Sequence, residues 1–380
     1  MSWPEVTLGD HVELVSGPAF KSSRFTDNPE DIPLIKGDNI GQGRILWEKS
    51  KYWPSSDADS YSRFLLEEGD VVLAMDRPWV TAGLKFACIS GSDPASLLVQ
   101  RVARLRGLDD LSTRYLRYVV ASNDFSRYVK AIMGGTNVPH ISGDQIRAFK
   151  IALPTKAEQQ SICEVLSSYD DLIENNRRRI QLLDQAARLL YIEWFVRLRF
   201  PGHEHLKVID GAPEGWSRRP LGEVAPLNYG KALKKDNRVP GPYAVYGSSG
   251  IVGTHKKALV PGPGIIVGRK GNVGSVFWST ADFHPIDTVY YIGPDKSSLY
   301  LYYSLQHLHF INTDVAVPGL NRDFAHSRLL NEPEPIIVSQ FEEFSAALHA
   351  QMDLLTRQNE ALVSARDLLL PRLMNGEIAV

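Results

Sequence analysis

Cysteine is scarce in this chain, and so are the patterns in which cysteine usually acts. The 380 residues include only Cys88 and Cys163, with no CxxC spacing and no histidine cluster beside either of them. A disulfide framework or a zinc site needs more sulfur or imidazole than this. We therefore expect both thiols to be packing residues, and we expect no bound metal.

Long apolar runs are missing as well. No stretch approaches the roughly 18 apolar residues of a transmembrane helix, and the N-terminus has no basic segment followed by an apolar core. These absences predict a soluble, cytoplasmic protein with no membrane partner.

Three catalytic patterns are also absent. The chain has no G-x-x-x-x-G-K-[ST], no N/D-P-P-aromatic tetrapeptide of amino-methyltransferases, and no acidic pair followed by E-x-K as in restriction nucleases. His203 and His205 form an H-x-H pair, but no third ligand lies near them in sequence, so they read as exposed histidines. The sequence predicts a non-catalytic chain without a cofactor.

Charge is unevenly distributed along the chain. The formal net charge is −2, yet ten basic residues oppose two acidic ones from Ser217 to Ser275, and eight acidic residues oppose three basic ones from Asn331 to Val380. A local basic excess is typical of phosphate binding, although a basic face without a ligand is the alternative. From Ser2 to Gly107 twelve bases meet fifteen acids, so a binding surface there would be a local patch.

The sequence repeats its own plan. Landmarks of the first half recur 213 positions later, and further matches follow at offsets of 185 and 179. The repeat predicts two globular parts, each a mixture of short strands and a short helix, and each followed by a long helix. The matched pairs include Trp3/Trp216, Leu8/Leu221, Gly17/Gly230, Tyr115/Tyr300 and Pro139/Pro318.

Each long helix has an apolar seam. Apolar residues between Thr155 and about Leu198 follow steps of four and three, and the pattern returns 182 positions later. This spacing predicts a coiled coil within one chain, with Asn176 facing Gln358 and capping boxes at Thr155 and Ser339. Because the chain passes through a globular part between the two helices, we expect them to pair antiparallel. The expected pairing positions are Ile162, Leu166, Tyr169, Ile173, Asn176, Ile180, Leu183, Phe344, Leu348, Leu355, Gln358, Leu362 and Leu369.

Several stretches resemble one protein family, the specificity subunits of type I restriction-modification systems. They are IALPTKAEQQSI (Ile151–Ile162), EWFVRLRFPGHE (Glu193–Glu204), APEGW (Ala212–Trp216), GRKGNVGSVFW (Gly268–Trp278) and LPRLMNGEI (Leu370–Ile378).

The resemblance implies an α+β fold in which two target-recognition domains are held apart by two conserved helices, with a pseudo-twofold repeat. It assigns residues 1–153 and 216–335 to the recognition domains, 154–200 and 336–380 to the helical spacers, and 201–215 to a linker. Each domain would read one half of a bipartite, asymmetric site on double-stranded DNA. Methyltransferase subunits would dock on the helices, and ATP-dependent endonuclease subunits would join them.

Polar and basic residues in the predicted loops are the candidates for DNA contact. Arginine can pair with both acceptors of guanine, asparagine with adenine, and lysine with phosphate, but each residue alone is a weak signal that also fits ordinary turn chemistry. The candidates are Lys36, Asn39, Arg77, Thr136, Asn137, His140, Ser248, Ser249, Lys256, Arg269, Lys270, Asn272, Asn321 and Arg322.

One rival interpretation stays open at this point. The chain could be a coiled-coil assembly scaffold whose globular parts bind protein or carbohydrate, which the basic segment 217–275 disfavours. Tyr191, Trp194 and Phe195 are expected to pack against a globular part rather than stack on bases.

Overall fold

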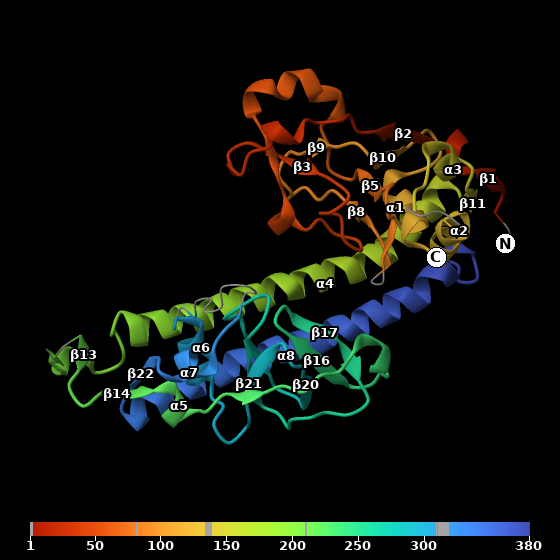
Figure 1. The fold of residues 1–380 in the computed structure, drawn as a ribbon. Coiled ribbons are helices and arrows are strands. Elements are labelled where there is room, and N and C mark those ends of the chain that lie inside the picture. The colour runs from red at the N-terminus through yellow and green to blue at the C-terminus, as the bar shows by residue number, and fades with distance from the viewer. Residues whose placement is uncertain (1–2, 81–82, 134–138, 210, 309, 311–318) are drawn as a thin grey trace. The chain divides into compact units, whose positions relative to one another are not determined.

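The chain folds into two compact units. The computed structural model describes all residues except 1–2, 81–82, 134–138, 210, 309 and 311–318. Unit 1 comprises Met1–Asn175 and Gln358–Val380, and unit 2 comprises Asn176–Arg357. Both units mix helices and strands, so the expected α+β class is confirmed (Figure 1). Two long helices, α4 (Lys156–Tyr191) and α8 (Pro335–Met374), contribute to both units.

Unit 1 is built on a four-stranded antiparallel sheet of order β2-β10-β5-β8. All four residues of β5 are buried, which explains why this strand is the continuous apolar run VVLA. A smaller sheet pairs β3 with β4 and β9, and β1 pairs with β11. The strands are β1 Glu5–Thr7, β2 Val12–Ser16, β3 Ile32–Ile35, β4 Tyr52–Trp53, β5 Val71–Ala74, β6 Trp79–Val80, β7 Gly83–Leu84, β8 Phe86–Cys88, β9 Leu97–Leu98, β10 Val102–Gly107 and β11 Lys150–Ala152.

The helices of unit 1 follow the strands that they cover. Ser122 separates α1 from α2 and caps α2 by accepting a hydrogen bond from the Phe125 N–H. The short helix expected in this globular part is therefore two helices. The helices are η1 Leu8–Asp10, η2 Ser22–Arg24, η3 Trp47–Lys49, η4 Ser55–Phe64, α1 Thr113–Ala121, α2 Asn123–Ile132 and α3 Gly143–Arg147.

Unit 2 has the same plan with a sheet of order β15-β21-β18-β19 and a three-stranded sheet of order β17-β16-β20. Its strands are β12 Val208–Ile209, β13 Ala212–Pro213, β14 Ser217–Pro220, β15 Asn228–Tyr229, β16 Tyr243–Gly247, β17 Gly250–His255, β18 Gly264–Gly268, β19 Val276–Ser279, β20 Phe283–Pro285, β21 Val289–Ile292 and β22 Leu329–Glu332. Its helices are the π-helical turn η5 Ile192–Val196, η6 His203–His205, α5 Leu221–Val224, η7 Lys235–Asn237, α6 Leu299–Gln306 and α7 Arg322–His326.

Backbone hydrogen bonds confirm the internal repeat. The Gly17 N–H donates to the Val102 carbonyl at 3.1 Å, and the Gly230 N–H donates to the Val289 carbonyl at 3.2 Å. An added Cβ at either glycine would lie 2.3 or 2.0 Å from a backbone carbonyl oxygen, so no larger residue fits. The repeat noticed in the sequence is therefore a repeat of backbone geometry.

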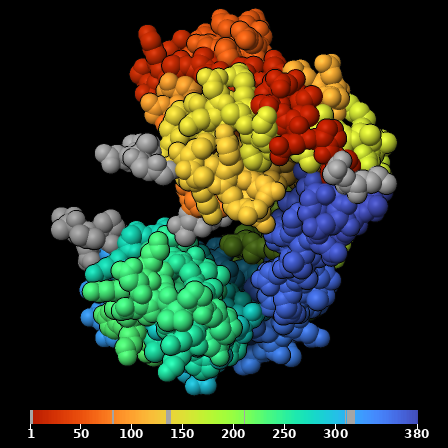
Figure 2. All heavy atoms as spheres, turned by 90° about the vertical axis from the view of Figure 1, so that its right-hand side faces the viewer, coloured from red at the N-terminus to blue at the C-terminus, as the bar shows by residue number. Residues whose placement is uncertain are grey.

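The core of unit 1 includes both long helices. Ile162 and Leu166 from the first half of α4 share a buried cluster with Leu370 and Leu373 from the end of α8. Figures 1 and 2 show this end of α8, in blue, beside the first residues of the chain, in red. Cys163 lies in the same cluster, and burial raises the pKa of its thiol to about 11, so it is a packing residue as expected.

The core of unit 2 includes the opposite parts of the same helices. Tyr191 and Phe195, from the end of α4 and the turn after it, lie with ring centres 6.0 and 5.1 Å from Phe341 near the start of α8. Trp194 joins this buried aromatic cluster. The end of α4 meets the start of α8 here, whereas its first half meets the end of α8 in unit 1. The two helices therefore pair antiparallel, and the three aromatic residues pack as expected.

The predicted seam on α8 is wrong at Gln358, whereas Phe344 lies at the margin of the pairing, with its ring centre 6.1 Å from that of Trp194. Phe344 is 57% exposed, and Gln358 is also exposed. Fully buried Phe341 lies one turn earlier, and the amide that contacts α4 is Asn359, which donates to the Ile173 carbonyl at 3.2 Å. A straight helix has 3.6 residues per turn, so its buried face drifts from a strict seven-residue repeat.

The two predicted capping boxes had different outcomes. The Thr155 N–H donates to Glu158 at 2.8 Å, which confirms the cap of α4. Ser339 lies inside α8, which begins at Pro335, so the second box is wrong. The Glu342 carboxylate instead accepts hydrogen bonds from the backbone of Leu299 and Tyr300 at the start of α6, where a negative charge favours the helix.

The seam correction leads to a prediction about stability. Phe341→Ala should lower the free energy of unfolding by about 3–5 kcal/mol, because it empties a fully buried site. Phe344→Ala, on the same helix, should cost less than about 1 kcal/mol because that ring is mostly exposed. Urea unfolding of both variants measures the difference, and equal losses would contradict the observed seam.

Candidate nucleic-acid interface

Three loops of unit 2 meet where β18 turns into β19. The backbone N–H groups of Arg269 and Lys270 both donate to the Thr288 carbonyl, at 2.9 and 3.0 Å. The Ser275 hydroxyl donates to the Ser248 carbonyl at 2.6 Å and ties the turn to the β16–β17 hairpin. We call this region the unit 2 loop end, defined as residues 248–249, 269–275 and 319–322.

Hydrogen bonds to Arg269 and Tyr290 hold the third of these loops, residues 319–322. The Leu320 N–H donates to the Arg269 carbonyl at 2.8 Å, and the Tyr290 hydroxyl donates to the Leu320 carbonyl at 2.9 Å. Burial and the neighbouring Tyr229 raise the pKa of Tyr290 to about 12, so this hydroxyl keeps its proton at neutral pH. The sheet therefore holds the loop end in place.

Tyr229, at the end of β15, contacts two guanidinium groups. The guanidinium carbons of Arg269 and Arg322 are 5.1 and 4.9 Å from the centre of its ring, which is cation–π distance. Its side chain is 49% exposed, and its ring meets Tyr290 edge-on at 5.1 Å. Arg269 also donates from Nη1 to the Asp287 carbonyl at 3.0 Å. Both arginines are thus oriented by their surroundings.

The structure gathers most of the sequence candidates of unit 2 into the loop end. Arg269, Lys270, Asn272 and Arg322 all lie there, and Ser248 contacts Asn272 through a hydrogen bond of 3.5 Å from the Asn272 N–H. Ser249 lies beside Ser248 in the same hairpin turn.

Two candidates of unit 2 have other roles or places. The Asn321 side-chain oxygen accepts from the N–H groups of Asp323 and Phe324 at 2.8 and 3.0 Å, so it caps α7. Lys256 follows β17 at the end of the hairpin opposite to Ser248, roughly 20 Å away at about 3.3 Å per strand residue. Lys256 is therefore outside the loop end.

The equivalent region of unit 1 is centred on a carboxylate. Asp76 accepts hydrogen bonds of 2.6 Å from Arg101 Nη1 and from His140 Nδ1. Arg77 is exposed with a positive φ of 44°, and its N–H donates to the Pro139 carbonyl at 2.7 Å. Burial opposes ionisation of Asp76, but its hydrogen bonds to His140 and Arg101 outweigh this and lower its pKa, so it is charged at neutral pH.

Lys36 lies at the surface, whereas Asn39 has a structural role in the core. Asn39 is fully buried, where its side-chain amide donates to the Leu34 carbonyl and to Ser50 and accepts from the Lys36 N–H. An amide occupied in this way has no groups left for a base, so the proposed contact by Asn39 is corrected. The Lys36 ammonium reaches Asp38 at 3.2 Å on the surface. Thr136 and Asn137 lie outside the described residues.

Sequence reasoning missed Tyr229, Tyr290 and Arg101, which complete these clusters. The repeat could have identified Tyr229, because it lies 213 positions after Ser16, the same offset that relates the first landmarks of the two copies. A large aromatic residue where the first copy has serine was the available signal.

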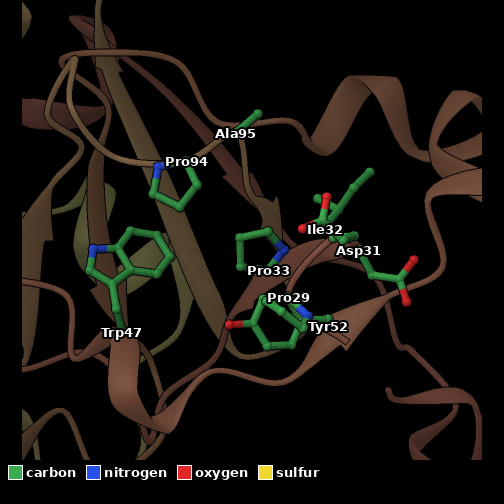
Figure 3. Close-up of a pocket in the computed structure, with 9 residues that line it drawn as sticks. Pro29, Asp31, Ile32, Pro33, Trp47, Tyr52, Pro94 and Ala95 are labelled. Atoms are coloured by element: carbon green, nitrogen blue, oxygen red, sulfur yellow. The ribbon is translucent and has the colours of Figure 1, made fainter. Parts of the chain in front are cut away.

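A hollow of about 340 Å³ on unit 1 is not part of this interface. Figure 3 shows the rings of Trp47, Tyr52 and Pro94 around it, and the remaining lining includes Glu30 and Asp31. Hydrogen bonds from Thr26 and Ser55 lower the pKa of Asp31, and no lysine or arginine lines the hollow, so it does not suit phosphate.

Two features of the described residues bear on other functions. No group of three His, Cys, Asp or Glu side chains in this part of the chain could hold a metal ion. None of the described helices has both the length and the apolarity needed to cross a bilayer.

Parts of this sequence are similar to known proteins. The specificity subunit of the type I restriction enzyme MjaVIII from Methanocaldococcus jannaschii is 32% identical over 187 residues, covering 49% of this chain and 44% of that protein. The EcoAI specificity subunit from Escherichia coli is 33% identical over 188 residues, covering 49% of this chain and 31% of that protein. The aligned stretches span less than half of these relatives' own lengths.

The fold and the family can also be compared across most of the chain. The crystal structure of a type I restriction-modification S subunit from M. genitalium matches with a TM-score of 0.57 and 18% identity, covering 98% of this chain and 96% of that chain. The family described as "Type I restriction modification DNA specificity domain" matches residues 2–185 and 213–323, which is more than half of the chain. The chain therefore belongs to the type I restriction-modification specificity family that its sequence resembles.

Proposed function

We propose that this chain reads DNA for a type I restriction-modification complex, each unit contacting one half of a bipartite, asymmetric site. The observation that carries the proposal is one backbone framework present twice, with different charged groups at its two loop ends. A repeated framework can meet one duplex twice, and different side chains at its loops can select different bases.

The proposed recognition domains are residues 1–153 and 216–335, with spacers at 154–200 and 336–380 and a linker at 201–215. In unit 2 the side chains assigned to DNA are those of the loop end, Ser248, Ser249, Arg269, Lys270, Asn272 and Arg322. In unit 1 they are Lys36, Arg77, Arg101 and His140, together with Thr136 and Asn137.

The two long helices are proposed to dock methyltransferase subunits, which endonuclease subunits then join. Several large apolar side chains on these helices are more than half exposed, and apolar groups left in water often mark protein contacts. Because the chain lacks motifs for nucleotide, methyl donor or nuclease metal, the partners would supply catalysis, in the cytoplasm. The exposed residues are Leu172, Leu182 and Leu189 on α4 and Ile336, Phe344 and Leu368 on α8.

The direct test is binding to DNA. The full chain, alone and with methyltransferase subunits, is titrated against a pool of random duplexes in a gel-shift assay, and the retained duplexes are sequenced. We expect enrichment of two short sequence elements at a fixed separation. Retention of unselected duplexes, or of none, would contradict the proposed function.

Lys270 should contribute charge rather than sequence preference. Lys270→Ala should weaken binding to all duplexes alike and reduce the slope of log K against log salt by about one unit, because one phosphate contact is lost. Lys296→Ala is a matched control, since this exposed lysine follows the far end of β21. A slope that is unchanged in Lys270→Ala would place Lys270 away from the DNA.

The docking proposal can be tested separately from DNA binding. Leu182→Glu with Leu189→Glu should reduce co-purification of methyltransferase subunits at least tenfold, because charges replace exposed apolar groups that would be buried. Gln185→Glu, an exposed position between them, is the control. Urea unfolding of the double variant should be unchanged, and full retention of the partner would contradict docking at this part of α4.

A further inference from the structure

The internal repeat allows the two units to be compared position by position. The Arg269 N–H donates to the Thr288 carbonyl at 2.9 Å, and in unit 1 the Met75 N–H donates to the Arg101 carbonyl at 2.8 Å. Met75 also accepts from the Ile141 N–H at 2.9 Å, as Arg269 accepts from the next loop in unit 2. Arg269 and Met75 therefore occupy equivalent backbone positions.

Tyr229 and Arg322 also have equivalents in unit 1 with different chemistry, namely Ser16 and Gly143. Strand register places Tyr229 opposite Tyr290, as it places Ser16 opposite Ala103. Arg322 is the first residue of α7, where α3 has Gly143. Ser16 and Met75 contact each other through a weak hydrogen bond of 3.6 Å from hydroxyl to sulfur. The two-arginine cluster is thus confined to unit 2.

Two positive charges flank one half-exposed ring in this cluster. Among the residues that the structure describes, no carboxylate pairs with either arginine, and Arg322 Nε is buried without a hydrogen-bond partner. Guanidinium groups without a carboxylate partner keep N–H donors for the acceptors of a ligand. Tyr229 is half-exposed, which places both guanidinium groups near the surface.

Guanine is the ligand that fits best. Its major-groove edge carries two acceptors, N7 and O6, which match the two donors of an arginine fork. Arg269 has one Nη1 hydrogen bond to a carbonyl and a face over Tyr229, so its orientation is fixed. A phosphate contact needs charge but little orientation, and neighbouring Lys270 already supplies charge.

We propose that Arg269 and Arg322 read a guanine in the half-site bound by unit 2, with Tyr229 as the positioning residue for both. This inference rests on the proposed function. Unit 1 has neutral residues at the three equivalent positions and reads its own half-site with the Asp76–Arg101–His140 cluster. The two half-sites therefore differ in the chemistry by which they are recognised.

The test removes one acceptor atom from the DNA. After the target has been selected from random duplexes, each guanine is replaced singly by 7-deazaguanine, which lacks the N7 acceptor. For the full chain with methyltransferase subunits, we expect one guanine of one half-site whose replacement weakens binding about 5- to 150-fold. Arg269→Met, which installs the unit 1 residue, should bind guanine and 7-deazaguanine equally there.

Four further variants distinguish positioning from general damage. Arg269→Lys keeps the charge but replaces the fork with one ammonium group, so it should retain binding with a smaller 7-deazaguanine penalty. Tyr229→Phe should keep the penalty and Tyr229→Ser should lose most of it, because the ring orients the guanidinium groups. Lys296→Ala, at an exposed position outside the loop end, should leave this penalty intact.

The possible results test the guanine inference separately from the proposed function. Sequence-specific binding with no 7-deazaguanine penalty that depends on Arg269 would overturn the guanine inference and leave the proposed function standing. An equal penalty in wild type and Arg269→Lys would overturn it too. Absence of sequence-specific binding by the wild-type complex would overturn both.

Discussion

The antiparallel pairing of α4 and α8 is the interaction on which both cores depend. The start of α4 and the end of α8 complete the core of unit 1, and the remaining parts of the same helices complete the core of unit 2. Asp170 on α4 strengthens the first pairing by accepting hydrogen bonds from Arg366 of α8 and Arg117 of α1 at 2.7 and 2.8 Å. Unit 1 is not one continuous stretch of sequence, because it needs Gln358–Val380 from the far end of the chain, whereas unit 2 is the continuous stretch Asn176–Arg357.

A shared framework explains how the units can diverge in function. Gly17 and Gly230 preserve one close approach between strands, and the same carbonyl and amide pairs fix the loops in both units. The exposed side chains that project from these fixed loops can change without disturbing a core, although Met75, the unit 1 equivalent of Arg269, is buried in the core of unit 1. In unit 1 Asp76 accepts hydrogen bonds from Arg101 and His140, whereas in unit 2 Tyr229 lies within cation–π distance of Arg269 and Arg322.

Much of the architecture was predictable from sequence because it depends on periodic or repeated signals. The glycine pair, the helix seam on α4 and the Thr155 cap all follow from local patterns. The α8 seam was less predictable: Phe344 and Phe341 fit helical spacing equally well, and tertiary packing decides between them. The site was harder still, since the contacts of Tyr229 with Arg269 and Arg322 join residues far apart in sequence. Asn39 is buried within a local turn, where it bonds Leu34, Lys36 and Ser50, and a polar residue in a predicted loop gives no sign of this burial.

The central claim is that each unit reads its own half of the target. It is tested most directly by a chain in which residues 3–153 also replace residues 216–335, so that both recognition domains have the unit 1 sequence. Selection from random duplexes should then give a target with two copies of one half-site, the half assigned to unit 1. Recovery of the original asymmetric target, or of only one half-site, would contradict the account.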